Sequence, residues 1–201
     1  MDENCQVYVM GDDKKSRILA AARSVFLRYG YKRVNMNDIA DAAGVSRPAL
    51  YVLFKNKEEI FIEAYLRWID ETIAQVEAAM AQTALPKDKM ARAFEIWAVG
   101  PFEMTMASPA AEELVDCNFA FAKAPREQGY AIFEATITPV VASLIETLPA
   151  ASRIAPGRIA HVLVSAVRGF KQTSATPDDM RQLIDELLLL SFHIDARNHA
   201  A

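Results

Sequence analysis

NDIADAAGVSRPALY, at residues 37–51, decides how the N-terminal part of the chain folds. Within this stretch Ala40 is small enough for two helices to cross closely, and Gly44, four residues later, permits a tight turn. Leu50, six residues further on, is placed to pack the second helix onto the first. This spacing predicts a helix-turn-helix, whose second helix presents its first turn to the major groove of DNA.

Helical signals continue on the N-terminal side of this stretch. A first helix is predicted from an apolar stripe at 3.6-residue spacing, made of Ile18, Ala22, Val25 and Tyr29, with Leu19 and Phe26 beside it. Gly30 suits the C-terminal end of that helix. Asn35 can cap the second helix, with Asp38 reaching back, and Ser46 can cap the third, with Pro48 in its first turn.

The rest of the sequence is also helical in pattern. Asn56 and Glu59 open a long fourth helix that runs to about residue 83. A fifth helix starts at Pro86 and ends at Gly100-Pro101, and four more are predicted at 109–123, 125–148, 159–174 and 177–194. Because no strand-like alternation is present, the sequence predicts an all-α chain of about nine helices, preceded by a flexible tail at residues 1–11.

Charge is divided unevenly along the chain. The net charge is −4, yet residues 14–57 hold ten basic and two acidic side chains, a net charge of +8. A basic N-terminal segment followed by an acidic remainder is typical of a protein that binds nucleic acid through one of its surfaces. The chain has only two cysteines, Cys5 and Cys117, no signal peptide and no long apolar run, so we expect a cytoplasmic protein without a membrane segment.

Further short runs accompany the helix-turn-helix, in order and without gaps between residues 15 and 68. They are ILAAA at 18–22, VF at 25–26, YGY at 29–31, DIA at 38–40, AGVS at 43–46, LYVLF at 50–54 and NKEEI at 56–60. Together they resemble the DNA-binding domain of the tetracycline-repressor (TetR) family of transcriptional regulators. The resemblance implies a helix-turn-helix DNA-binding domain at residues 12–57 and a helical ligand-binding and dimerisation domain at 58–201.

The resemblance and the chemistry of the residues agree on the DNA contacts. Arg47 can donate to a phosphate or to guanine O6 and N7, and the Tyr51 hydroxyl can donate to a phosphate. The full predicted set is Asn35, Ser46, Arg47, Pro48, Ala49, Tyr51, Lys55 and Lys57. Family members often have Thr where Asn35 stands and Gly-Thr where Pro48-Ala49 stands, so the operator sequence stays open.

The last two predicted helices are apolar on more than one side, which requires burial on more than one side. Pairing of both helices with their copies in a second chain would make a four-helix bundle, so we predict a homodimer; the alternative is a central place in a monomer core. The predicted interface residues are Ile159, Val162, Leu163, Ala166, Val167, Phe170, Leu183, Ile184, Leu187 and Leu188.

Aromatic and methionine side chains gather in the middle of the chain around a few polar groups, which predicts a small-molecule pocket. The candidate residues are Trp97, Phe102, Met106, Cys117, Asn118, Phe121, Tyr130, Phe133, His161 and Arg168. Ordinary core packing is the alternative for each of them. The resemblance implies a repressor: a small, mostly apolar effector moves the long fourth helix, and the dimer releases its palindromic operator.

Three other functions compete with this interpretation: a thiol-based redox sensor acting through Cys117, a helical enzyme and a non-specific architectural DNA binder. A lone cysteine near aromatic residues is more often buried and inert. The sequence contains no Cys, His, Asp or Glu cluster at metal-ligand spacing, no Gly-rich phosphate loop and no serine elbow. We therefore expect no enzyme activity, metal or cofactor, and an architectural binder would need no acidic, dimerising body of this size.

Overall fold

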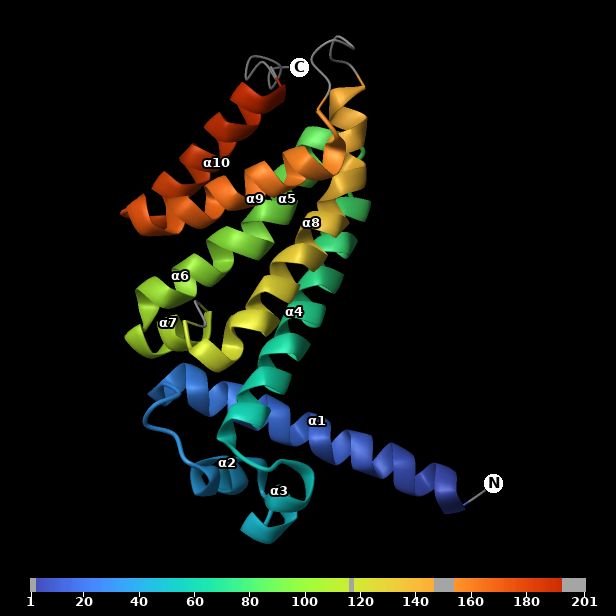
Figure 1. Ribbon diagram of the computed structural model, residues 1–201, viewed down its shortest axis with the longest axis vertical. Coiled ribbons are helices and arrows are strands. Elements are labelled where there is room, and N and C mark those ends of the chain that lie inside the picture. The colour runs from blue at the N-terminus through green and yellow to red at the C-terminus, as the bar shows by residue number, and fades with distance from the viewer. Residues whose placement is uncertain (1–2, 116–117, 147–153, 193–201) are drawn as a thin grey trace. The chain divides into compact units, whose positions relative to one another are not determined.

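The computed structural model describes residues 3–115, 118–146 and 154–192, and every secondary-structure element in these ranges is a helix (Figure 1). This confirms the all-α prediction. The chain divides into two compact units, residues 1–69 with 104–126 and residues 70–103 with 127–201. The sequence predicts a boundary between residues 57 and 58 instead, because no local signal shows that 104–126 folds with the N-terminal helices.

The first unit contains α1 (Glu3–Tyr29), α2 (Met36–Ala43), α3 (Arg47–Leu53) and the first half of α4 (Lys57–Ala81). From later in the chain it includes α7 (Pro109–Val115) and the short helix η2 (Ala120–Ala122). Figure 1 shows α2 and α3 together on one side of α1, and α2 contacts both of its neighbours. This is the three-helix arrangement that a helix-turn-helix requires.

An aromatic cluster joins the early and late segments of the first unit. The ring centroid of Tyr31 lies 4.7 Å from that of Phe119 and 5.3 Å from that of Phe121. Phe61 of α4 lies 4.9 Å from Tyr31 and 5.6 Å from Phe119. Each such ring pair stabilises the fold by about 0.5–1.5 kcal/mol beyond the burial of its area. Apolar packing therefore holds the segment 104–126 to the N-terminal helices.

Two helices differ in length from the predictions. α1 begins at Glu3, so residues 3–11 are helical where the sequence predicts a tail. Extending an existing helix costs little, because each added residue gains a hydrogen bond without a new nucleus. α7 ends at Val115 rather than near residue 123, and Phe119 is extended, with φ −79° and ψ 142°. The extended backbone lets Phe119 and Phe121 both reach the Tyr31 ring.

A π-helical turn, η1 (Glu95–Val99), joins α5 (Pro86–Phe94) to α6 (Gly100–Ala107) without a break. The prediction that Gly100-Pro101 ends the fifth helix is therefore wrong. Gly100 is helical, with φ −56°, and its N–H donates to the carbonyl of Glu95, five residues back. The wider turn shifts the hydrogen-bond register just before Pro101, which has no N–H to donate.

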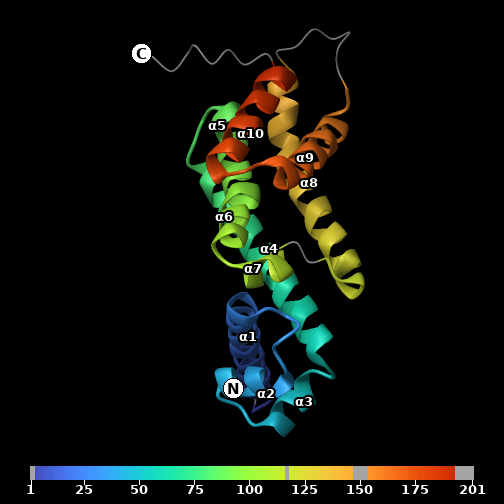
Figure 2. The same cartoon turned by 90° about the vertical axis from the view of Figure 1, so that its left-hand side faces the viewer.

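The second unit contains α5, η1, most of α8 (Lys123–Ile145), α9 (Pro156–Thr173) and α10 (Pro177–Phe192). Figure 2 shows α10 alongside α5, and α10 also contacts α9 and η1. Its core is built from fully buried side chains that include Phe94, Phe133, Ile137 and Leu163. In the part of the chain that the structure describes, every helix is too short or too polar to cross a membrane.

Candidate nucleic-acid interface

The start of α2 is fixed by a reciprocal cap. Asn35 Oδ1 accepts from the N–H groups of Asn37, at 2.8 Å, and Asp38, at 3.2 Å. In return Asp38 Oδ2 accepts from the Asn35 N–H at 2.8 Å, which confirms the predicted capping box. Since its side-chain oxygen is bonded within the protein, Asn35 can offer only its amide NH₂ to a phosphate.

The turn between α2 and α3 depends on Gly44. Its φ is +64°, in the left-handed region that favours glycine, and a Cβ there would meet no atom within 4 Å, so the backbone angle alone selects this residue. Leu50 of α3 is completely buried, as are Ile39 and Ala40 of α2. The helix-turn-helix predicted from the spacing of Ala40, Gly44 and Leu50 is therefore present.

The outer side of α3 carries the predicted base-reading residues. Ser46 Oγ accepts from the Ala49 N–H at 3.3 Å and caps the helix. Arg47, Pro48 and Tyr51 are exposed, and the Arg47 guanidinium carbon lies 5.5 Å from the centroid of the Tyr51 ring. A cation over an aromatic face is attracted to it, which restricts the directions that the arginine adopts. Both side chains are thus held at the surface on the same part of α3.

Val52, next to Tyr51, is an exposed apolar residue that the sequence reasoning missed. Its side chain is 83% exposed, although it lies only two residues after the buried Leu50. An apolar side chain in this place can contact a thymine methyl group. Helical periodicity could have identified it: each residue of a helix is rotated by about 100° from the one before, so Val52 points well away from the buried side of Leu50.

The two predicted lysine contacts have different surroundings. Lys55 is exposed, whereas Lys57 Nζ donates to the carbonyls of Tyr31 and Val34, both at 2.7 Å. The Lys57 ammonium also lies 4.1 Å from the centroid of the Tyr31 ring. Desolvation lowers the pKa of Lys57, while the nearby carboxylate of Glu113 opposes this change. Lys57 therefore ties the start of α4 to the turn between α1 and α2, a role that the sequence did not predict.

A side chain of α7 also binds the turn between α1 and α2. Glu113 Oε2 accepts from the Lys32 N–H at 3.1 Å. Gly30, with φ +81°, leaves room for this carboxylate, because a Cβ on Gly30 would lie 3.2 Å from Glu113 Oε2. Burial raises the pKa of Tyr31 to about 12, so its hydroxyl is protonated at neutral pH. Lys57 and Glu113 together fix the segment that leads into α2.

Four of the predicted pocket residues come together in the second unit. Trp97 stacks on Phe133, with ring centroids 4.5 Å apart and planes at 4°, and Tyr130 lies 6.0 Å from Trp97. The Arg168 guanidinium carbon lies 4.1 Å from the Tyr130 ring centroid. Trp97, Tyr130 and Arg168 line a cavity of about 10 Å³, which has room for about one water molecule. The aromatic site is present but closed.

Two further pocket candidates, Asn118 and Phe121, belong to the first unit. Phe121 stacks on Phe119, with ring centroids 5.3 Å apart. Asn118 Oδ1 accepts from Arg126 Nη1 at 2.8 Å. The predicted pocket therefore combines residues of two different units.

The remaining candidates are Phe102, Met106, His161 and Cys117. Phe102 is buried and Met106 is exposed. His161 is exposed, and its Nδ1 lies 3.0 Å from the carboxylate of Glu134. Cys117 lies outside the described residues, so the redox hypothesis rests on the sequence alone.

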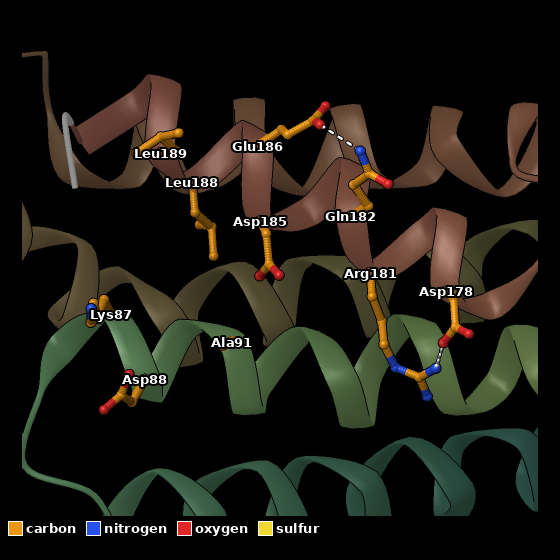
Figure 3. Close-up of a pocket in the computed structure, with 10 residues that line it drawn as sticks. All are labelled: Lys87, Asp88, Ala91, Asp178, Arg181, Gln182, Asp185, Glu186, Leu188 and Leu189. Atoms are coloured by element: carbon orange, nitrogen blue, oxygen red, sulfur yellow. Dashed lines mark hydrogen bonds and ion pairs between the residues drawn. The ribbon is translucent and has the colours of Figure 1, made fainter. Parts of the chain in front are cut away.

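A larger, open groove of about 530 Å³ lies between α5 and α10. Figure 3 shows Asp185 and Leu188 pointing into it from α10, with Arg181 reaching towards α5. Arg181 Nη2 donates to Glu95 at 2.7 Å and to Glu103 at 2.6 Å, and these bonds raise its pKa. The sequence did not predict this groove, because its two walls lie far apart in the chain.

The predicted dimer residues divide by their burial within one chain. Four of them belong to the core of their own chain: Leu163, Val167, Ile184 and Leu188. The others are half-buried or exposed, and they form one stripe on each helix: Ile159, Val162, Ala166 and Phe170 on α9, and Leu183 and Leu187 on α10. Leu190, which is 77% exposed, continues the α10 stripe and was missed from the sequence.

Known proteins resemble this chain first in its N-terminal part. The family model described as bacterial regulatory proteins of the tetR family matches residues 18–64, which include α2, the turn and α3. The HTH-type transcriptional activator FasR of Mycolicibacterium smegmatis is 34% identical over 84 residues, 42% of this chain and 38% of that protein. The chain spans about two fifths of the length of such curated relatives.

Solved structures resemble the chain over most of its length. FadR of Thermus thermophilus, a TetR family transcriptional repressor in complex with lauroyl-CoA, has a TM-score of 0.59 at 20% identity and covers 93% of this chain and 98% of its own. A protein from Saccharomonospora viridis in complex with choline has a TM-score of 0.67 at 19% identity, covering 88% and 96%. These likenesses show a shared fold. The family model in turn identifies residues 18–64, which carry the helix-turn-helix, with the tetR family of bacterial regulatory proteins.

Proposed function

We propose that this chain is a DNA-binding transcriptional repressor that binds a palindromic operator as a homodimer and is released by a small, mostly apolar effector. The observation that carries the proposal is the presentation of α3: Leu50 is completely buried against α2, while Arg47 and Tyr51 are exposed beside each other. A helix held in this way fits the major groove. The net charge of +8 over residues 14–57 adds the attraction to phosphates.

The stripes on α9 and α10 support dimerisation. Val162 is 51% exposed and Leu190 is 77% exposed, although both are apolar. Contiguous apolar surface on a folded protein marks an interaction site. A two-fold pairing of these helices would present two α3 helices to half-sites about 34 Å apart, as helix-turn-helix dimers do.

The proposal is tested by binding to a random duplex library and sequencing of the retained DNA. We expect a palindrome whose half-sites lie about one helical turn, ~34 Å, apart. Retention of DNA without any enriched sequence at low salt, where phosphate contacts are strongest, would contradict specific reading. The recovered operator, placed before a reporter gene, then tests the sign of regulation, since a repressor lowers expression and an activator raises it.

The effector proposal is supported by the closed aromatic site of the second unit. Trp97 and Phe133 are stacked, and the cavity beside them is only about 10 Å³. A ligand that enters this site must displace these rings, which are carried by η1 and α8. Arg168, which also pairs with the Glu127 carboxylate at 3.4 Å, and Lys171 line the same cavity and supply positive charge for an anionic end group. The effector class that fits is an amphiphile with an apolar body and an anionic end.

We expect lauroyl-CoA, taken as a probe of this class, to weaken binding to the operator, and the operator to weaken binding of the probe by the same factor. Operator displacement and the affinity for the probe measured with and without DNA check this reciprocity. Trp97→Ala is expected to keep operator binding and to lose the response. A response that survives the substitution would place the effector elsewhere, with the α5–α10 groove as the next site to test.

A further inference from the structure

α1 presents two cations to the turn between α2 and α3. Lys14 and Arg17 lie one helical turn apart and line a groove of about 410 Å³. The remaining lining residues are Asp13 on α1, then Gly44 and Val45 of the turn, and Ser46 and Ala49 at the start of α3. One wall of the groove is therefore the edge of the recognition helix itself.

The neighbouring cation of α1 has a different role. Lys15 Nζ lies 2.6 Å from the carboxylate of Glu63 and 5.5 Å from the centroid of the Phe54 ring, so it packs against α4 and the end of α3. Among the residues whose side chains the structure describes, Lys14 and Arg17 form no such ion pair. Among the described residues that line the groove, Asp13 is the single carboxylate, so this part of the lining has a net positive charge.

The geometry of α3 indicates which DNA strand the groove faces when α3 lies in the major groove. Leu50 is buried, and each helical residue rotates by about 100°, so Ala49 and Tyr51 lie on opposite flanks of the helix. A helix in the major groove has one sugar-phosphate backbone along each flank. On the first flank, the predicted phosphate contact is the hydroxyl of Tyr51. Lys14 and Arg17 lie on the second, beside Ala49.

We propose that Lys14 and Arg17 bind backbone phosphates of the operator strand that runs along the Ala49 flank of α3. This inference rests on the proposed function and adds to it a second line of phosphate contacts, supplied by α1 rather than by the helix-turn-helix. Phosphate contacts of this kind position a reader without selecting a sequence. The two cations therefore add affinity for any duplex and fix the register in which Arg47 meets the bases.

The test is the double variant Lys14→Gln with Arg17→Gln, measured in fluorescence anisotropy on the recovered operator and on a scrambled duplex over a series of salt concentrations. A dimer of the variant lacks four phosphate contacts, so the slope of log K against log salt should decrease by about 3.6 in magnitude. Affinity should fall on the order of tenfold or more, by the same factor on both duplexes. An unchanged slope with unchanged affinity would overturn the proposal.

The matched control is Lys89→Gln with Arg92→Gln on α5, in the second unit, which makes the same change in net charge. An equal loss in both double variants would show a general charge effect and would also overturn the proposal. A melting curve of each variant checks folding. If the parent enriches no palindrome, the proposed function fails, yet the slopes on the scrambled duplex still decide whether Lys14 and Arg17 meet phosphates.

Discussion

Arg47→Ala should lower affinity for the recovered operator by about 30-fold at the least. A bidentate arginine–guanine pair contributes about 1–3 kcal/mol of discrimination, and a homodimer loses it at both half-sites, so the two losses add. The structure places Arg47 at the first position of α3, exposed and near the Tyr51 ring, where it can reach either a base edge or a phosphate. A base contact and a phosphate contact predict different affinities of the variant for operator and scrambled duplexes.

If Arg47 reads a guanine, the variant should lose its preference at one base pair of each half-site and bind scrambled DNA nearly as well as the parent does. The measurement is a second selection from the random library, with affinities on operator and scrambled duplexes. Lys55→Ala serves as the reference for a loss of affinity without a change in base preference, because Lys55 is a predicted DNA contact that lies beyond the end of α3. A uniform loss on all DNA, with a smaller salt slope, would assign Arg47 to a phosphate instead.

The helix-turn-helix could be predicted from sequence because its causes are local. The φ of +64° at Gly44, the oxygen of Asn35 that caps α2 and the buried Leu50 all act within fifteen residues of one another. Each of these features requires a particular type of residue at a fixed spacing, so the motif can be predicted without knowledge of distant contacts. For the same reason the exposure of Arg47 and Tyr51 on α3 could be inferred from the position of Leu50, although Val52 was missed.

Features that depend on distant segments could not be predicted in this way. Lys57 carries the signature of a helix start, yet its ammonium binds the carbonyls of Tyr31 and Val34, which lie more than twenty residues earlier. Phe121 belongs to the aromatic cluster around Tyr31 rather than to the cluster of Trp97 and Phe133, because residues 104–126 fold with the N-terminal helices. Composition showed that aromatic residues were numerous, but not which unit each one joins.

The dimer stripes show the same limit. Helical periodicity identified the apolar residues of α9 and α10, but it could not separate Leu163 and Ile184, which the chain buries by itself, from Val162, which stays exposed. The reason is that a helix with two apolar sides can pack either of them against the core of its own chain. Only the packing of α10 on α5 and α9 decides which stripe remains for a partner.

Val162→Asp with Leu190→Asp should convert the dimer to a monomer without unfolding the chain. Both side chains are more than half exposed in one protomer, so their carboxylates stay hydrated there. In the proposed dimer the two-fold axis brings four new carboxylates into one apolar interface, and burial of unpaired charges there costs several kcal/mol. We expect dimerisation to weaken on the order of a thousandfold or more, measured by analytical ultracentrifugation, with the melting temperature of the helices measured alongside.

Leu189→Asp is the control for α10, because it adds one carboxylate to the same helix as Leu190→Asp does. Leu189 follows Leu188 into the α5–α10 groove, about 100° around α10 from Leu190 and away from the predicted stripe. This variant should stay dimeric. If it dissociates while the double variant stays dimeric, the interface lies on the groove side of α10, and the proposed stripe is wrong.

The monomer also tests the link between dimerisation and DNA reading. A single helix-turn-helix meets one half-site, so it makes half of the phosphate contacts of the dimer. The slope of log K against log salt should therefore fall to about half of the parent value. Operator affinity should approach the affinity for an isolated half-site, while base preference within that half-site is kept, since α3 and its cap are unchanged. Loss of the base preference as well would mean that pairing of the two chains shapes α3 itself.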